Sequence, residues 1–260
     1  MIAALTAALE TGETALIAAA LVFARIGGAI AALPLYGETS LPARVKLVAA
    51  LALTALVAPA VATPDTLPRM PEDLPGGIAL LGGETVVGLA FGLLIRLLIH
   101  ALQIAGMMIA QSTSLAQLLG GAGADPMPAI GHLLVVAALA LIAITDLHVA
   151  MAAAVMQTYA LFPVGAVMQA GALAEVGIAH VARAFGLAFS LAAPFLLGSF
   201  VYQLALGAIN RAMPQLMVVF VGAPALTGFS LAGMALIAPL LLQVWADALA
   251  ATLAAPFGTP

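Results

Sequence analysis

The chain has no cysteine, and charged residues make up only 7% of its 260 residues. The absence of cysteine excludes disulfide bonds and thiolate metal sites. Its four histidines occur at no HxxH or HExxH spacing, so we expect no metal site and no cofactor. The chain also lacks any run of basic residues, and its formal net charge is −4. We therefore expect no nucleic acid among its partners.

Most of the sequence is apolar. Hydrophobic residues account for 65% of it and its mean hydropathy is +1.22, whereas an ordinary soluble domain is about 25% charged. This composition predicts an integral membrane protein that meets its partners and the membrane lipids through apolar faces.

Prolines, glycines and short polar stretches divide the sequence into six hydrophobic segments, so the fold class we predict is an all-α membrane protein of about six long, kinked helical segments arranged as hairpins. The segments cover residues 15–33, 45–62, 78–119, 129–162, 172–209 and 217–253. Three of them are far longer than the roughly 20 residues that a bilayer needs. These long segments must tilt, kink or leave the membrane.

The third segment carries polar groups at helical spacing. Six residues share one stripe on a helix of 3.6 residues per turn: Arg96, His100, Gln103, Met107, Gln111 and Ser114. Before this stripe, Gly88 and Gly92 form a GxxxG pair, which predicts a surface that the backbone of another helix approaches closely. After it, glycines and prolines from residue 120 to 128 end the helix in a flexible loop.

Several charges lie inside the apolar segments. An isolated charge at the centre of a bilayer costs from about 2.5 to over 10 kcal/mol, so Arg25, Glu84, Arg96 and Asp146 need partners. Pairing between helices of the bundle is the least costly explanation. Arg211 differs, because it lies at a polar corner between the last two segments. A charge at such a tip can reach the membrane interface and so avoids the cost of burial in the bilayer.

In five blocks the sequence resembles the FliR family, the R-type subunits of the type III secretion export gate, whose injectisome counterparts are the T-type subunits. The blocks are RIGGAIAALP from Arg25, GETVVGLAFG around Glu84, AGMMIAQ with the later Asp125-Pro126, LGAINRAMPQL from Leu206, and VFVGAP after it. Pro42 and Lys46, just before and within the start of the second segment, match as well. LGAINRAMPQL together with VFVGAP is the most specific match. The resemblance extends over nearly the whole chain.

The resemblance implies a single export-gate membrane domain made of two parts, a P-type-like helical part over residues 1–165 and a Q-type-like hairpin over residues 166–260. It implies FliP-type and FliQ-type subunits as partners, FlhB-type and FlhA-type export proteins as neighbours, and unfolded flagellar proteins as cargo. It also implies a location in the bacterial inner membrane, within the export apparatus of the flagellar basal body.

Two sets of site residues follow from the resemblance together with the pattern. The loop matched by residues 110–128 would plug a closed channel, and the candidates for this plug or gate are Met107, Met108, Gln111, Gly120, Gly121, Gly123, Asp125, Pro126 and Pro128. The candidates for packing between subunits are Arg25, Glu84, Gly88, Gly92, Arg96, Asn210, Arg211, Pro214 and Gln215.

Other function classes remain open on the sequence alone. An injectisome T-type subunit would share these motifs, and a secondary transporter also has broken hydrophobic helices with buried charges. No internal repeat pairs the two halves of this chain, which disfavours a transporter. The sequence has no HExxH, no GxSxG and no paired carboxylates, so we predict that the protein is not an enzyme.

Overall fold

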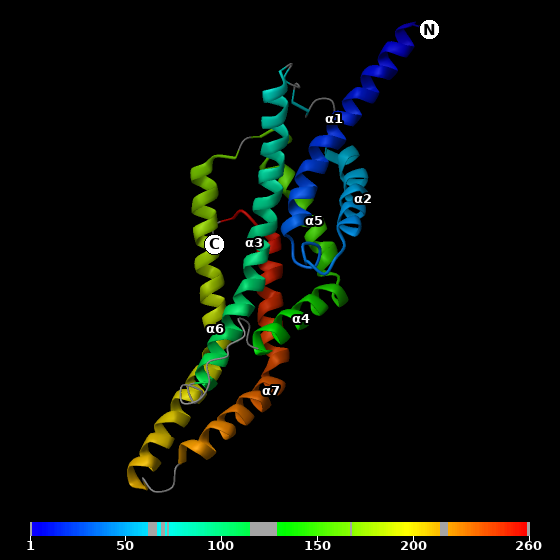
Figure 1. Cartoon of the computed structure of the whole chain (residues 1–260). Coiled ribbons are helices and arrows are strands. Elements are labelled where there is room, and N and C mark those ends of the chain that lie inside the picture. The colour runs from blue at the N-terminus through cyan, green and yellow to red at the C-terminus, as the bar shows by residue number, and fades with distance from the viewer. Residues whose placement is uncertain are drawn as a thin grey trace. The chain divides into compact units, whose positions relative to one another are not determined.

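The structure is a computed structural model, shown in Figure 1, and it describes residues 2–61, 67–68, 71, 73–114, 129–166, 168–213 and 218–258. In these ranges every regular element is an α-helix, which confirms the predicted all-α fold class. The helices are α1 (Ile2–Ala32), α2 (Ala43–Val61), α3 (Leu74–Ser114), α4 (Ala129–Ile144), α5 (Leu147–Leu161), α6 (Ala170–Ala212) and α7 (Val218–Ala254).

Across the described part of the chain, five helices are long and apolar enough to cross a membrane, or six if α4 and α5 together form one bent span. The longest of these stretches, Ala170–Ala212 and Leu74–Ser112, have 43 and 39 residues. These helices confirm a multi-pass membrane protein. They also confirm that α3 and α6 are much longer than a bilayer requires.

The predicted fourth segment, residues 129–162, is not one helix. It is broken into α4 and α5, whose axes differ by 77°. Asp146 lies at the break with a φ of 57°, a left-handed conformation that aspartate tolerates better than most residues. Its carbonyl oxygen accepts the first hydrogen bonds of α5, from Val149 N at 2.9 Å and Ala150 N at 3.2 Å. The break leaves the Asp146 side chain exposed instead of buried in an apolar helix.

The chain forms two compact units. Unit 1 contains Met1–Arg96, Ile142–Ala179 and Ala250–Pro260, and unit 2 contains Leu97–Leu141 and His180–Leu249. Each unit draws on both sides of residue 165, so the division into a P-type-like and a Q-type-like part stays a prediction.

Each unit has its own buried apolar residues. In unit 1 they include Leu21, Val22 and Ile26 of α1 and Phe91 and Ile95 of α3. In unit 2 they include Leu102 and Ile109 of α3, Ala188 of α6 and Trp245 of α7.

Candidate functional site

The most elaborate polar arrangement in the structure is built around Arg25 and Glu84 in unit 1. The guanidinium Nε of Arg25 on α1 lies 2.6 Å from Oε2 of Glu84 on α3. Both side chains are almost completely buried, with exposed fractions of 0% and 1%. A buried ion pair tolerates so dry an environment only if its remaining donors and acceptors are also satisfied. The sequence predicts that each of these charges needs a partner on another helix; the structure shows that the two pair with each other.

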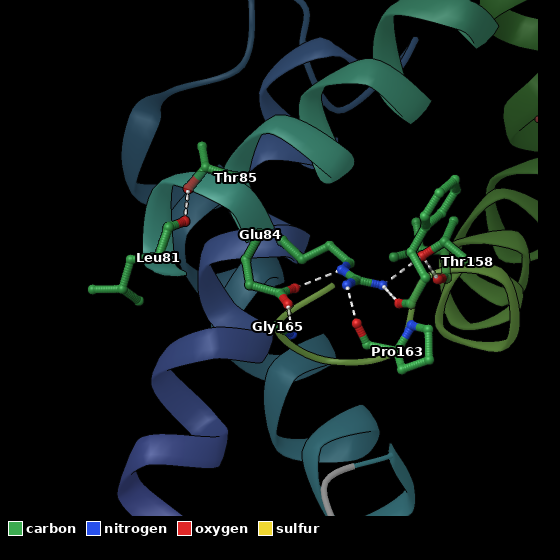
Figure 2. A network of polar contacts seen from close by, with 9 residues as sticks. Leu81, Glu84, Thr85, Thr158, Pro163 and Gly165 are labelled. Atoms are coloured by element: carbon green, nitrogen blue, oxygen red, sulfur yellow. Dashed lines mark hydrogen bonds and ion pairs between the residues drawn. The ribbon is translucent and has the colours of Figure 1, made fainter. Parts of the chain in front are cut away.

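The other donors of Arg25 contact α5 and the residues that follow it. Its Nη1 donates to the carbonyl oxygen of Phe162 at 2.8 Å and to Oγ1 of Thr158 at 3.4 Å, and its Nη2 donates to the carbonyl oxygen of Pro163 at 3.5 Å. Figure 2 shows these bonds converging on one guanidinium group. The Arg25 Cζ also lies 3.9 Å from the centre of the Tyr159 ring, a cation–π contact.

The second oxygen of Glu84 fixes the link between α5 and α6. Its Oε1 accepts the backbone N–H of Gly165 at 2.6 Å, as Figure 2 shows. Gly165 has a φ of +82°, and a Cβ atom there would lie 2.8 Å from Cγ of Pro68. Glycine suits this position because it adopts positive φ without steric cost. One ion pair thus holds α1, α3 and residues 162–165 together.

Glycines allow α1 and α3 to approach closely enough for this pair to form. A Cβ at Gly88 would overlap the carbonyl oxygen of Arg25, and one at Gly92 would lie 2.7 Å from that of Ala29. Across the same contact, a Cβ at Gly28 of α1 would lie 2.5 Å from the carbonyl oxygen of Thr85. The close approach predicted from the GxxxG pair is confirmed, and the helix that approaches is α1 of the same chain.

Arg96 has a different environment, although it also lies on α3. Its Nη1 donates to the carbonyl oxygen of Ala32, the last residue of α1, at 3.2 Å, and its Nη2 lies 3.4 Å from Oε1 of Glu38. Arg96 and Glu38 are 26% and 24% exposed. A cation at this place satisfies a carbonyl that the end of α1 would otherwise leave without a partner.

Beyond Arg96, the predicted polar stripe lies on the accessible side of α3. Nδ1 of His100 and Oε1 of Gln103 are 2.7 Å apart, so these two side chains satisfy each other. His100 and Gln111 are exposed, and Met107 is 39% exposed. The Ser114 side chain lies outside the described residues.

Three of the candidates for the plug or gate line one groove in unit 2. Met107, Met108 and Gln111 of α3 face α6 across a groove of about 640 Å³. The other six candidates lie outside the described residues: Gly120, Gly121, Gly123, Asp125, Pro126 and Pro128. Their role in a plug stays a prediction.

The candidates for packing between subunits separate into two groups. Arg25, Glu84, Gly88, Gly92 and Arg96 find their partners inside the chain. Asn210 and Arg211 are exposed at the end of α6, while Pro214 and Gln215 lie outside the described residues. Contact with another subunit stays a prediction for all of them.

Sequence reasoning missed the residues that complete the Arg25 site: Thr158, Tyr159, Phe162 and Gly165. They lie more than 130 positions from Arg25 along the chain, and the only local signal was a proline and a glycine after an apolar segment. It also missed Trp245, the single tryptophan, which is fully buried in unit 2 and donates its Nε1–H to the carbonyl oxygen of Leu98 at 2.8 Å.

The described residues contain no group of three or more histidine, aspartate or glutamate side chains that could hold a metal ion. The arrangement of Arg25 and Glu84 also presents no open position to a substrate, because both side chains are buried and bonded to the protein. Its geometry suits the holding of helices rather than the transformation of a bound molecule.

Comparison with known proteins gives consistent similarities. Residues 16–252 match the family described as Bacterial export proteins, family 1. The chain is 34% identical to the flagellar biosynthetic protein FliR of Caulobacter vibrioides over 235 residues, which cover 88% of this chain and 91% of that protein. It is 28% identical to the FliR proteins of Pectobacterium carotovorum, over 84% of this chain and 83% of that one, and of Bacillus subtilis, over 78% and 79%.

Proposed function

We propose that this chain, which belongs to the FliR family of bacterial export proteins, is a membrane subunit of the flagellar type III protein export gate. The observation that carries this proposal is the extent of the family match. It covers residues 16–252 and so includes all or most of each described stretch that is long and apolar enough to span a membrane.

The geometry supports a role in assembly rather than in chemistry. Large apolar side chains are exposed on both helices of the α6–α7 hairpin, among them Phe189 at 59%, Leu197 at 66%, Phe229 at 70% and Leu236 at 82%. Such faces must be covered by lipid or by other helices. In unit 1 the buried Arg25–Glu84 pair is bonded within the chain, whereas the buried Tyr159 hydroxyl has no hydrogen-bond partner among the described residues. The protein performs no bond chemistry in this proposal.

The proposal extends to partners and location. FliP-type and FliQ-type subunits would cover the exposed faces and complete a protein-conducting channel, with FlhB-type and FlhA-type proteins beside it and unfolded flagellar proteins as cargo. The complex would lie in the bacterial inner membrane at the flagellar basal body. Met107, Met108, Gln111 and the loop after them would then contribute to the closed gate.

Purification tests this proposal. The tagged chain should leave the membrane in a large hetero-complex when it is co-expressed with FliP-type and FliQ-type partners, and its yield should rise several-fold over expression alone. Mass spectrometry of the purified complex would identify the subunits. A monodisperse monomer or symmetric homo-oligomer of equal yield in both cases would contradict the proposal and favour a transporter.

Complementation separates a flagellar role from an injectisome role. The chain is expressed in strains that lack the corresponding subunit. Restoration of injectisome secretion, but not of motility, would favour a T-type role.

A further inference from the structure

Trp245 and Asp247, two positions apart on α7, face opposite sides of the helix. Trp245 is fully buried in unit 2 and donates its Nε1–H to the carbonyl oxygen of Leu98 on α3 at 2.8 Å. Successive residues of an α-helix are rotated by about 100°, so Asp247 lies on nearly the opposite side from Trp245. The Asp247 side chain is exposed. The bond that fixes Trp245 thus directs the carboxylate away from the interior of unit 2.

Asp247 shares its side of α7 with large apolar side chains. Leu236 and Leu240 lie 11 and 7 residues before it, which places the three residues within about 40° on the helix. Gln243, one turn before Asp247, lies on the same side. All four side chains are exposed. We call these four residues the outer face of α7: it is apolar over its first two members and ends in an amide and a carboxylate.

No described residue of the chain supplies a cation to this carboxylate. The two arginines of unit 2, Arg183 and Arg211, both lie on α6, and neither forms an ion pair with Asp247.

Asp247 nevertheless lies inside a stretch that is long and apolar enough to cross a membrane, Ala225–Ala254. It is seven residues from the end of that stretch, or about 10 Å along the helix. Long lysine and arginine side chains can extend to an interface, but the single methylene of aspartate cannot bridge such a distance. A carboxylate in this place therefore needs a cation from outside the chain.

We propose that the outer face of α7 binds a membrane-spanning helix of a partner subunit that presents an arginine or lysine to Asp247. This inference rests on the proposed function, in which other subunits cover the hairpin, and it adds the chemistry of one contact. Apolar side chains of the partner helix pack on Leu236 and Leu240, and its cation lies at the carboxylate of Asp247. Residues four apart on a helix are neighbours, so the same cation also reaches the side-chain oxygen of Gln243. Arginine suits the two acceptors better than lysine, because its planar group offers several donors in a fixed geometry.

A helix fits this face better than the amine of a lipid headgroup. The face extends from Leu236 to Asp247, which are 11 residues apart, or about 16 Å and three helical turns. The charge is followed by a further apolar stretch, residues 248–254, that contains no charged residue. A headgroup amine lies at the membrane surface, whereas a cation on a neighbouring helix can lie at any depth.

Asp247→Asn tests the contact, because it removes the charge and keeps the shape of the side chain. The tagged chain is co-expressed with FliP-type and FliQ-type subunits, and the fraction that stays in complex after dilution in a mild detergent is measured. We expect this fraction to fall at least about ten-fold, the effect of breaking a charge pair at an interface. The melting temperature of the chain alone should not change, since the side chain is exposed. Glu175→Gln is the control: it neutralises the other exposed carboxylate of the α6–α7 hairpin and should leave the fraction unchanged.

Cross-linking and charge exchange identify the cation. A photoreactive phenylalanine analogue in place of Leu240 should attach to a partner subunit, and mass spectrometry should find an arginine or lysine within about two helical turns of the attachment point. Asp247→Arg should disrupt the complex as Asp247→Asn does. Combining Asp247→Arg with an aspartate at the partner's basic position should restore at least half of it.

The outcomes separate this inference from the proposed function. If the unaltered chain forms the complex and Asp247→Asn forms it equally well, the contact at Asp247 is wrong and the proposed function stands. Attachment of the probe at position 240 only to lipid, or only to a second copy of the chain, would also overturn the inference. If the unaltered chain forms no complex, the proposed function fails and this inference fails with it.

Discussion

Arg25 and Arg211 are both arginines on long apolar helices, but the protein treats them in opposite ways. Arg25 is fully buried in unit 1, and its guanidinium has four bonding partners in the same chain. Arg211 is exposed at the end of α6 in unit 2, on a hairpin with no acidic residue between positions 184 and 246. The first arginine is used to hold three parts of the fold together. The second remains available to molecules outside the chain.

The comparison shows what determines the fate of a charge in an apolar chain. A buried guanidinium persists where glycines let backbones approach and where carbonyls without helical partners, such as those of Phe162 and Pro163, supply acceptors. A guanidinium at a helix terminus needs no such enclosure, because it can extend to an interface. Removing a bonding partner of Arg25 should therefore destabilise the folded chain far more than any substitution of Arg211.

We expect the largest effect from Glu84→Ala. It leaves the Arg25 guanidinium buried without its counter-charge and removes the acceptor for Gly165 N–H, so it should destabilise the folded chain by about 3 to 5 kcal/mol. Unfolding in detergent, followed by fluorescence-detected size exclusion after heating, measures the loss.

Two variants control this prediction. Glu38→Ala removes the partner of Arg96, but that pair is about a quarter exposed and should cost no more than about 1 kcal/mol. Replacing both buried charges, as Arg25→Met with Glu84→Leu, should recover part of the stability lost by Glu84→Ala. Equal losses in Glu84→Ala and Glu38→Ala would show that burial does not distinguish the two pairs.

The next largest effect should come from Gly88→Ala. The added methyl group would overlap the carbonyl oxygen of Arg25, and because this obstacle is backbone it cannot move without separating α1 from α3. We expect a loss of about 3 kcal/mol, the upper end for overpacking. Gly83→Ala is the control on the same helix, where a Cβ meets no atom within 4 Å, and it should stabilise the helix slightly. The same thermal assay compares them.

The glycine and charge patterns illustrate how much of the site could be predicted from sequence. The six apolar segments, the close approach at Gly88 and Gly92 and the need of Arg25 and Glu84 for partners all follow from local composition and helical period. Local composition does not predict that Arg25 pairs with Glu84 rather than with another charge. Pairing between positions 59 apart depends on how the helices pack.

Backbone acceptors are harder still to anticipate. The carbonyl oxygen of Phe162 carries no residue-specific signal, since every residue has one. The break at Asp146 escapes prediction for a related reason: one charged residue in an apolar run is compatible with both a continuous helix and a bend. Only packing decides between a helix that buries the carboxylate and a bend that exposes it.

We expect a moderate effect at Trp245, whose buried side chain forms a hydrogen bond between α7 and α3 in unit 2. Trp245→Phe keeps an aromatic ring but removes the Nε1–H donor to the carbonyl oxygen of Leu98, so we expect a loss of about 1 to 2 kcal/mol. Tyr202→Phe removes a comparable bond, from its hydroxyl to the carbonyl oxygen of Gly222 at 3.0 Å, at a half-buried position. It should cost less. A larger loss for Tyr202→Phe would show that burial does not set the cost of losing these two hydrogen bonds.

The smallest effect on stability should come from Arg211→Ala, and this variant tests the comparison most directly. The side chain is exposed, so the free energy of unfolding should change by no more than about 0.5 kcal/mol. The melting temperature and membrane insertion should therefore hardly change. If neighbouring gate subunits use the guanidinium, co-purification with FliP-type and FliQ-type partners and motility should nevertheless fall. Arg211→Lys should restore them only in part, because lysine keeps the charge but lacks the planar fork that makes two parallel hydrogen bonds. Full assembly and motility in both variants would remove Arg211 from the subunit contacts.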